Sequence, residues 1–324
     1  MDKKTLRIIY MGTPEFAVES LKELVENEYN VVAVVTMPDK PAGRGHKIQY
    51  SDVKKYALSQ NLPILQPSNL KDEAFIEELK SYKADLQIVV AFRMLPEVVW
   101  DMPRLGTFNL HASLLPQYRG AAPINWAIIN GDKETGVTTF FLEHEIDTGK
   151  IIMQERVAIG ENDSVGEIHD KLMILGGKVV TETVDRIIAN QVNPLSQSQI
   201  IENECIEMRP APKIFKETCE INWDQPLEVV HNFIRGLSPY PAAWSTLTST
   251  SGESWKVKIF KTRKVQKEHN IAIGSVFQEG REDLKIAVQG GYLDILEMQL
   301  PGKRRMPIAD LLRGFDIDSS FKMN

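Results

Sequence analysis

Short apolar runs alternate with amphipathic stretches along the first half of the chain. Several runs are rich in β-branched residues, which is typical of strands buried in a parallel sheet. They predict strands at residues 5–11, 30–36, 62–66, 85–91, 105–111, 136–142 and 151–157. The other stretches predict helices at residues 14–26, 53–60, 72–82, 123–130 and 164–190. This order favours an α/β fold with a right-handed, doubly wound, Rossmann-like parallel sheet.

A different pattern fills the last third of the chain. Five short alternating stretches predict strands at residues 243–248, 255–262, 274–277, 284–288 and 292–298, with helices at 226–235 and 308–313. Five such strands are typical of a small OB-like β-barrel, a fold that often binds nucleic acids. A polar, proline-containing segment precedes this region. We therefore expect an α/β domain at residues 1–193, a linker at 194–210 and an OB-like domain at 211–324.

The composition agrees with two globular domains. The chain has 324 residues, and a domain averages roughly 150. No apolar run reaches the roughly 18 residues of a membrane span, and the first residues lack a signal-peptide pattern. The two cysteines, Cys205 and Cys219, have no metal-ligand or disulfide-framework spacing. We expect a cytoplasmic monomer with no metal and no membrane partner.

The net charge of −6 argues against a nucleic-acid partner, but the charge is unevenly distributed. Residues 1–206 hold 21 Lys and Arg against 29 Asp and Glu, whereas residues 207–324 hold 17 against 15. The basic residues of the second part cluster at 256–267 and 303–305. Local patches decide the attraction of phosphates, although a solvated face of an ordinary domain has the same composition.

Polar residues end the strand predicted at 105–111. Asn109 and His111 are two positions apart and therefore project from the same face. Ligands of open α/β sheets bind beyond the carboxyl ends of the strands. A second polar strand end, which contains Asp147, follows the strand at 136–142. These residues favour a catalytic site, although a half-buried structural histidine is the more common reason for a lone His at a strand end. The chain lacks the Gly-x-Gly-x-x-Gly motif and the P-loop lysine of nucleotide sites.

The segment at residues 37–50 is too long and irregular for an ordinary connection between strand and helix. It alternates prolines and glycines with Lys40, Arg44 and Lys47. Such a cationic arm suits a phosphate backbone, where lysine and arginine supply affinity that does not depend on sequence. The alternative is a flexible surface loop.

Four motifs occur in order between residues 109 and 149: Asn109-x-His111, Ser113-Leu114-Leu115-Pro116, Arg119-Gly120-Ala121-Ala122-Pro123-Ile124 and Asp147-Thr148-Gly149. In this combination the chain resembles the folate-dependent formyltransferases, and within them the branch that acts on initiator tRNA. The resemblance implies that Asn109, His111 and Asp147 are catalytic. It also implies folate contacts at Ser113, Leu114, Leu115 and Pro116, and an acceptor-stem contact by the arm around Pro41–Gly45.

The resemblance is less close at Phe92, Arg93, Met94 and Leu95. This segment should line the pteridine pocket, but its short form is similar to the glycinamide ribonucleotide branch. The implied tRNA contacts are basic residues of the arm and of the last domain: Lys40, Arg44, Lys47, Arg263, Lys264, Lys303, Arg304 and Arg305.

The implied reaction moves the formyl group of 10-formyltetrahydrofolate to the α-amino group of methionyl initiator tRNA. The product, N-formylmethionyl-tRNA, serves translation initiation. Asn109 would donate a hydrogen bond to the oxyanion, His111 would shuttle a proton, and Asp147 would orient His111 and relay the proton through water. None of these steps needs a metal.

Three other functions stay open at this stage. A formyltransferase for glycinamide ribonucleotide or a nucleotide sugar would share the catalytic residues, but it would not need the arm or a basic second domain. A folate-binding hydrolase would use water as the acceptor. A non-enzymatic RNA-binding protein would explain the basic clusters but not the pattern of Asn109, His111 and Asp147.

Overall fold

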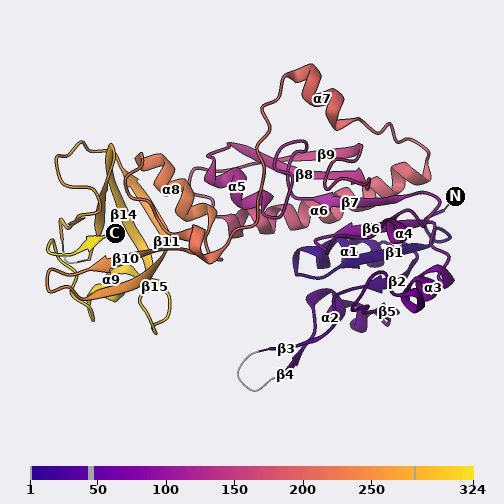
Figure 1. Cartoon of the computed structure of the whole chain (residues 1–324), viewed down its shortest axis with the longest axis horizontal. Coiled ribbons are helices and arrows are strands. Elements are labelled where there is room, and N and C mark those ends of the chain that lie inside the picture. The colour runs from indigo at the N-terminus through magenta and orange to yellow at the C-terminus, as the bar shows by residue number, and fades with distance from the viewer. Residues whose placement is uncertain (1, 43–46, 281) are drawn as a thin grey trace. The chain divides into compact units, whose positions relative to one another are not determined.

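The structure is a computed structural model that describes residues 2–42, 47–280 and 282–324. Its contacts divide the chain into two compact units (Figure 1). Unit 1 comprises Met1–Gly120, Thr135–Val157 and His169–Pro210. Unit 2 comprises Ala121–Glu134, Ala158–Ile168 and Ala211–Asn324.

Unit 1 is built on one mixed sheet, whose strands follow the order β5-β2-β1-β6-β7-β8-β9. The strands are β1 (Ile8–Gly12), β2 (Val31–Val35), β5 (Ile64–Leu65), β6 (Leu86–Val90), β7 (Thr107–His111), β8 (Glu134–Phe141) and β9 (Ile151–Ala158). The pairs from β5 to β7 are parallel, as the sequence predicts. The strands β1 and β6 are buried along their whole length.

The strand β8 departs from the expected parallel arrangement. It runs antiparallel to β7, and Asn109 pairs with Phe140 while His111 pairs with Thr138. A parallel neighbour requires a crossover connection, usually through a helix packed on the sheet. The helix between these strands, α5 (Pro123–Ile129), belongs instead to unit 2, so β8 enters the sheet in the opposite direction.

The remaining helices up to residue 204 are α1 (Phe16–Glu26), α2 (Asp52–Ser59), α3 (Glu73–Ser81), α4 (Glu97–Trp100), α6 (Val165–Ile188) and α7 (Gln197–Glu204). Side chains fix the starts of two of them. The Ser51 hydroxyl accepts a hydrogen bond from the Lys54 N–H, and Asp72 accepts from the first turn of α3. The helix α7 lies in the segment expected to be a linker, whose polar composition conceals it.

The expected irregular arm has regular structure at its base. The strands β3 (Lys40–Ala42) and β4 (Lys47–Gln49) pair as an antiparallel hairpin (Figure 1). The prolines and glycines obscure the short alternation of these strands in the sequence. Arg44 lies outside the described residues.

The sheet of unit 2 is antiparallel and follows the order β12-β13-β14-β11-β10-β16, with β15 beside β14. Its strands are β10 (Ala243–Thr248), β11 (Ser254–Val265), β12 (Val276–Phe277), β13 (Lys285–Val288), β14 (Gly291–Gln299), β15 (Met306–Pro307) and β16 (Lys322–Met323). Five of them match the predicted strands, and β15 and β16 are additional. A single bridge between Ser275 and Lys322 links the two ends of this order. The described strands thus form the antiparallel sheet that the sequence predicts for this region. They do not show the closed OB-like barrel that we expected.

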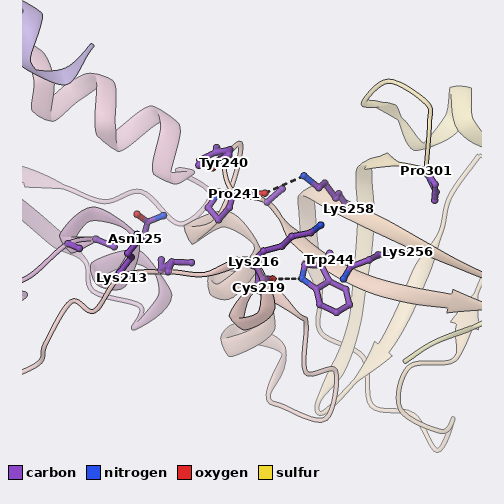
Figure 2. Close-up of a pocket in the computed structure, with 14 residues that line it drawn as sticks. Asn125, Lys213, Lys216, Cys219, Tyr240, Pro241, Trp244, Lys256, Lys258 and Pro301 are labelled. Atoms are coloured by element: carbon purple, nitrogen blue, oxygen red, sulfur yellow. Dashed lines mark hydrogen bonds between the residues drawn. The ribbon is translucent and has the colours of Figure 1, made fainter. Parts of the chain in front are cut away.

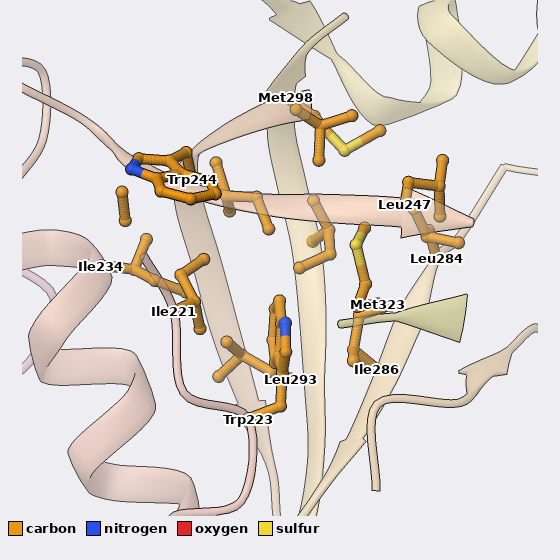
Figure 3. Packing of buried hydrophobic residues seen from close by; sticks show 14 of the residues in the cluster. Ile221, Trp223, Ile234, Trp244, Leu247, Leu284, Ile286, Leu293, Met298 and Met323 are labelled. Atoms are coloured by element: carbon orange, nitrogen blue, oxygen red, sulfur yellow. The ribbon is translucent and has the colours of Figure 1, made fainter. Parts of the chain in front are cut away.

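The core of unit 2 is formed by the apolar faces of this sheet and of α8 (Leu227–Gly236). Figure 3 shows Ile234 of α8 directed toward Ile221, and Trp223 beside Leu293. The short helix α9 (Ile308–Leu312) and the 3-10 helix η1 (Lys216–Cys219) complete the elements of this unit. The residues around this core therefore form a unit with an interior of its own.

Candidate active site

The imidazole of His111 lies at the end of β7 and is only 7% exposed. Its Nε2 atom is 2.8 Å from the carbonyl oxygen of Tyr118. A carbonyl oxygen can only accept, so the hydrogen-bond network assigns the proton of the neutral ring to Nε2. The other ring nitrogen, Nδ1, is then left to accept or exchange a proton.

Asp147 faces that second nitrogen from the loop between β8 and β9. Its Oδ2 atom lies 4.0 Å from His111 Nδ1 and accepts a hydrogen bond of 2.9 Å from the Gly120 N–H. A separation of 4.0 Å is too long for a direct hydrogen bond and leaves room for a shared water. The structure thus brings His111 and Asp147 together.

Asn109 lies two residues before His111 on the same strand face and is half-buried. Its side-chain amide hydrogen-bonds none of the residues that the structure describes. Polar groups that are partly buried usually have a partner. The free amide is therefore available to a ligand.

The turn at residues 113–116 uses its own side chains internally. The buried Ser113 hydroxyl donates to the carbonyl of Gln117 at 2.7 Å. Thr138 of β8 donates to the Ser113 carbonyl at 2.6 Å and accepts from the Leu115 N–H at 3.1 Å, and Gln154 of β9 donates to the Leu115 carbonyl at 2.7 Å. Thr138 and Gln154 were not identified from the sequence as residues that hold this turn. Both are polar side chains within predicted strands, and that pattern could have pointed to them.

The segment Phe92–Leu95 follows β6, and its residues 93–95 line a pocket of about 730 Å³ together with residues 68–71 and 96–98. Met94 is 72% exposed, whereas Leu95 is buried. Arg93 Nη1 donates to the Ser68 carbonyl at 2.9 Å, and within the described residues its buried Nε–H has no partner. Burial lowers the pKa of Arg93.

Three of the predicted tRNA contacts already hold acidic partners. Arg263 pairs with Asp294 at 2.6 Å, Lys264 pairs with Glu228 at 2.6 Å, and Arg305 pairs with Glu297. Lys40, Lys303 and Arg304 are exposed. Lys47 belongs to β4, and Arg44 lies outside the described residues. Arg263 and Arg305 are exposed as well, but their acidic partners offset the charge that they could offer to a phosphate.

A pocket of about 640 Å³ in unit 2 is lined by four other lysines, Lys213, Lys216, Lys256 and Lys258 (Figure 2). The Lys256 Nζ atom lies 3.0 Å from the centre of the Trp244 ring, and the indole N–H of Trp244 donates to the Lys216 carbonyl. Sequence reasoning did not join these residues into one site. Lys256 and Lys258 are two positions apart on β11, which places them on one face of the strand.

The described residues contain no group of three or more His, Cys, Asp or Glu side chains that could hold a metal ion. No helix in the same part of the chain is both long and apolar enough to cross a membrane.

Known proteins resemble this chain along its whole length. It matches the formyl transferase family over residues 5–184 and the C-terminal domain of formyl transferases over residues 213–316. A protein of Bacteroides thetaiotaomicron named methionyl-tRNA formyltransferase is 64% identical over 324 residues, which cover all of both chains. A protein of that name from Bacteroides fragilis is 63% identical and covers 100% of this chain and 99% of its own.

A solved structure shares the fold. The N-formyltransferase from Helicobacter canadensis, in complex with folinic acid and dTDP-3-aminofucose, aligns with a TM-score of 0.64 at 21% identity. The alignment covers 93% of this chain and all of that chain. By its family matches and its identity to the two Bacteroides proteins, this chain belongs to the methionyl-tRNA formyltransferase family.

Proposed function

We propose that this protein transfers the formyl group of 10-formyltetrahydrofolate to the α-amino group of methionine on initiator methionyl-tRNA. The product, N-formylmethionyl-tRNA, serves translation initiation. The observation that carries this proposal is the Asp147 carboxylate held 4.0 Å from His111 Nδ1, in a chain 64% identical to a methionyl-tRNA formyltransferase. When bound, the folate supplies the activated formyl group.

Asn109 is the proposed donor to the negative charge that develops on the formyl oxygen. Its amide is free of other described partners and projects from the same strand face as His111. A neutral amide placed before the reaction stabilises such charge without reorganising, and the loss of one donor typically costs a hundredfold or more.

His111 and Asp147 are the proposed acid–base pair. The Tyr118 carbonyl fixes one tautomer, so proton exchange falls to Nδ1 on the side of Asp147. The attacking amine must lose a proton and the leaving nitrogen must gain one. The carboxylate faces Nδ1 across the room for a single water, which would relay the proton.

Two segments of unit 1 are the proposed folate contacts. The turn Ser113, Leu114, Leu115 and Pro116 is fixed by Thr138 and Gln154, so it presents a rigid backbone. The segment Phe92–Leu95 adds apolar surface, which includes the exposed Met94 side chain. The two together suit a planar heteroaromatic group.

The tRNA is the proposed partner of unit 2 and of the β3–β4 hairpin. The four lysines that line the pocket beside Trp244 supply positive charge, which suits the phosphate backbone of a nucleic acid. We infer that the sheet of unit 2 curls into an OB-like barrel, because the Ser275–Lys322 bridge links the ends of its strand order. The proposed domains are a catalytic domain at 1–193, a linker at 194–210 and a tRNA-binding domain at 211–324.

The proposed substrates suggest where the protein acts, and the residues of the proposed site suggest its oligomeric state. Initiator tRNA and reduced folate meet in the cytoplasm, and a single chain carries every residue of the proposed site. We therefore propose a cytoplasmic monomer.

Formyl transfer to three acceptors tests the proposal. The purified protein is given 10-formyltetrahydrofolate with initiator methionyl-tRNA, elongator methionyl-tRNA or glycinamide ribonucleotide. We expect transfer to the initiator tRNA alone. Transfer to the small amine alone would keep the catalytic residues and contradict the proposed role of the hairpin and of unit 2.

A further inference from the structure

The side chain of Gln197 is a junction within unit 1. It is the first residue of α7 and is 1% exposed. Its Oε1 atom accepts two hydrogen bonds from Arg119, from Nε at 3.0 Å and from Nη2 at 2.7 Å. Its Nε2 atom donates to the carbonyl oxygens of Asp147 at 2.9 Å and Gly149 at 2.8 Å. The amide therefore joins α7, the Arg119 segment and the loop before β9.

These partners leave the amide one orientation. A guanidinium only donates, and a backbone carbonyl only accepts. A flipped amide would place its NH₂ group against Arg119 and its oxygen against two carbonyls. All four hydrogen-bonding positions of the buried amide are filled, so the junction is both specific and costly to disturb.

The junction fixes both segments that position the Asp147 carboxylate. One segment is the Asp147 backbone itself, which has a φ of +57°, a conformation unfavourable for residues that carry a Cβ. The other segment is Arg119–Gly120, whose Gly120 N–H holds Asp147 Oδ2 at 2.9 Å. Gln197 binds the first through the Asp147 carbonyl and the second through Arg119.

We propose that Gln197 is a positioning residue for formyl transfer, acting through Asp147 to hold its carboxylate at His111. This inference rests on the proposed function of the site. Within the described residues no hydrogen bond joins Gln197 to His111, so its effect must pass through the geometry of the Asp147 loop. Displacing a catalytic group by about 1 Å can cost about a hundredfold in rate.

The substitution Gln197→Glu tests the donor half of the junction. Glutamate keeps the size of the side chain and the acceptor for Arg119, but it loses both donors and sets negative charge against two carbonyl oxygens. We expect kcat to fall about tenfold or more while KM for both substrates stays within about twofold. Gln199→Glu is the matched control, because Gln199 is exposed on the same helix, and it should leave both constants unchanged.

A double-mutant cycle separates positioning from a general structural role. If Gln197 acts through Asp147, Gln197→Glu should reduce kcat little in an Asp147→Asn background. An equal loss in both backgrounds, an unchanged kcat in the single variant, or an effect confined to KM would contradict the inference. If Gln197→Glu lowers the unfolding temperature strongly, Arg119→Lys takes its place in the same double-mutant cycle with Asp147→Asn. That change leaves Gln197 in place but removes the paired guanidinium donors to its oxygen.

The parent protein is measured first with initiator methionyl-tRNA. An inactive parent would contradict the proposed function itself, whereas an active parent with an unaffected Gln197→Glu variant would contradict the role of Gln197 alone.

Discussion

The carboxylate of Asp147 lies 4.0 Å from Nδ1 of His111, on the side of the ring that the Tyr118 carbonyl leaves free. Two backbone groups thus set the geometry of this pair. The Tyr118 carbonyl fixes the tautomer of His111, and the Gly120 N–H fixes the position of the Asp147 carboxylate. The separation suits one bridging water rather than direct contact. In the proposed mechanism, proton transfer at His111 is therefore coupled to a carboxylate that is held in place.

Replacing Asn109 by alanine should remove the proposed donor to the formyl oxygen. We expect kcat to fall by about a hundredfold or more, with KM for both substrates little changed, because the bond is strongest in the transition state. Steady-state formylation of initiator methionyl-tRNA measures both constants. A rise in KM alone would assign Asn109 to substrate binding instead.

Replacing Gly149 by alanine should displace the Asp147 loop. A Cβ at this position would overlap the Phe141 carbonyl oxygen, which is backbone and cannot rotate away. We expect a clear loss of kcat together with a lower unfolding temperature, read from formylation assays and thermal unfolding. Gly314→Ala is the control, because a Cβ there meets no described atom within 4 Å. Normal activity of the Gly149 variant would show that the loop tolerates displacement.

Replacing Lys256 by serine should weaken binding of tRNA without affecting binding of folate. The change removes a cation from the pocket around Trp244 and its contact with that ring. We expect KM for tRNA to rise severalfold and its dependence on salt to become less steep. Lys261→Ser, on the same strand but outside the pocket, should have little effect. Equal effects of the two changes would indicate diffuse attraction and no defined site.

The buried His231 should make the stability of the protein depend on pH. Its ring contacts the Thr262 hydroxyl and the Glu161 carbonyl, and burial lowers its pKa; Arg235 and Lys264 add to this shift, and Glu228 opposes it. The unfolded chain then binds a proton near pH 6.5 that the folded chain does not yet bind. The free energy of unfolding should therefore fall as the pH drops below about 6.5.

Urea unfolding between pH 7.5 and pH 5 measures this dependence. His231→Gln keeps a donor and an acceptor but cannot titrate, so its stability should fall less over the same range. Parallel pH curves for the parent and the variant would rule out His231 as the source.

The sequence predicted the elements whose signal is local. The buried strands β1, β2 and β6 are apolar runs, and Asn109 and His111 could be placed on one face from their spacing alone. The resemblance to formyltransferases supplied Asp147, which is 36 positions beyond His111 and shares no local pattern with it.

What the sequence missed depends on contacts between distant segments. The direction of β8 follows from where α5 packs, and nothing in the segment between β7 and β8 specifies that. Gln197 is a polar residue in a polar helix, and only its burial and its four hydrogen bonds distinguish it from Gln199. The acidic partners of Arg263 and Lys264 come from other elements. The basic run in the sequence therefore predicted more unpaired positive charge than the structure has.

The most direct test of the account is the rate of a single turnover of formyl transfer to initiator methionyl-tRNA, compared between the parent and Asp147→Asn. Asparagine keeps the size of the side chain and an acceptor for the Gly120 N–H but removes the charge facing His111. We expect the rate of the Asp147→Asn variant to be at least about a hundredfold lower than that of the parent, with an unchanged Kd for the tRNA. A rate within about twofold of the parent would contradict it.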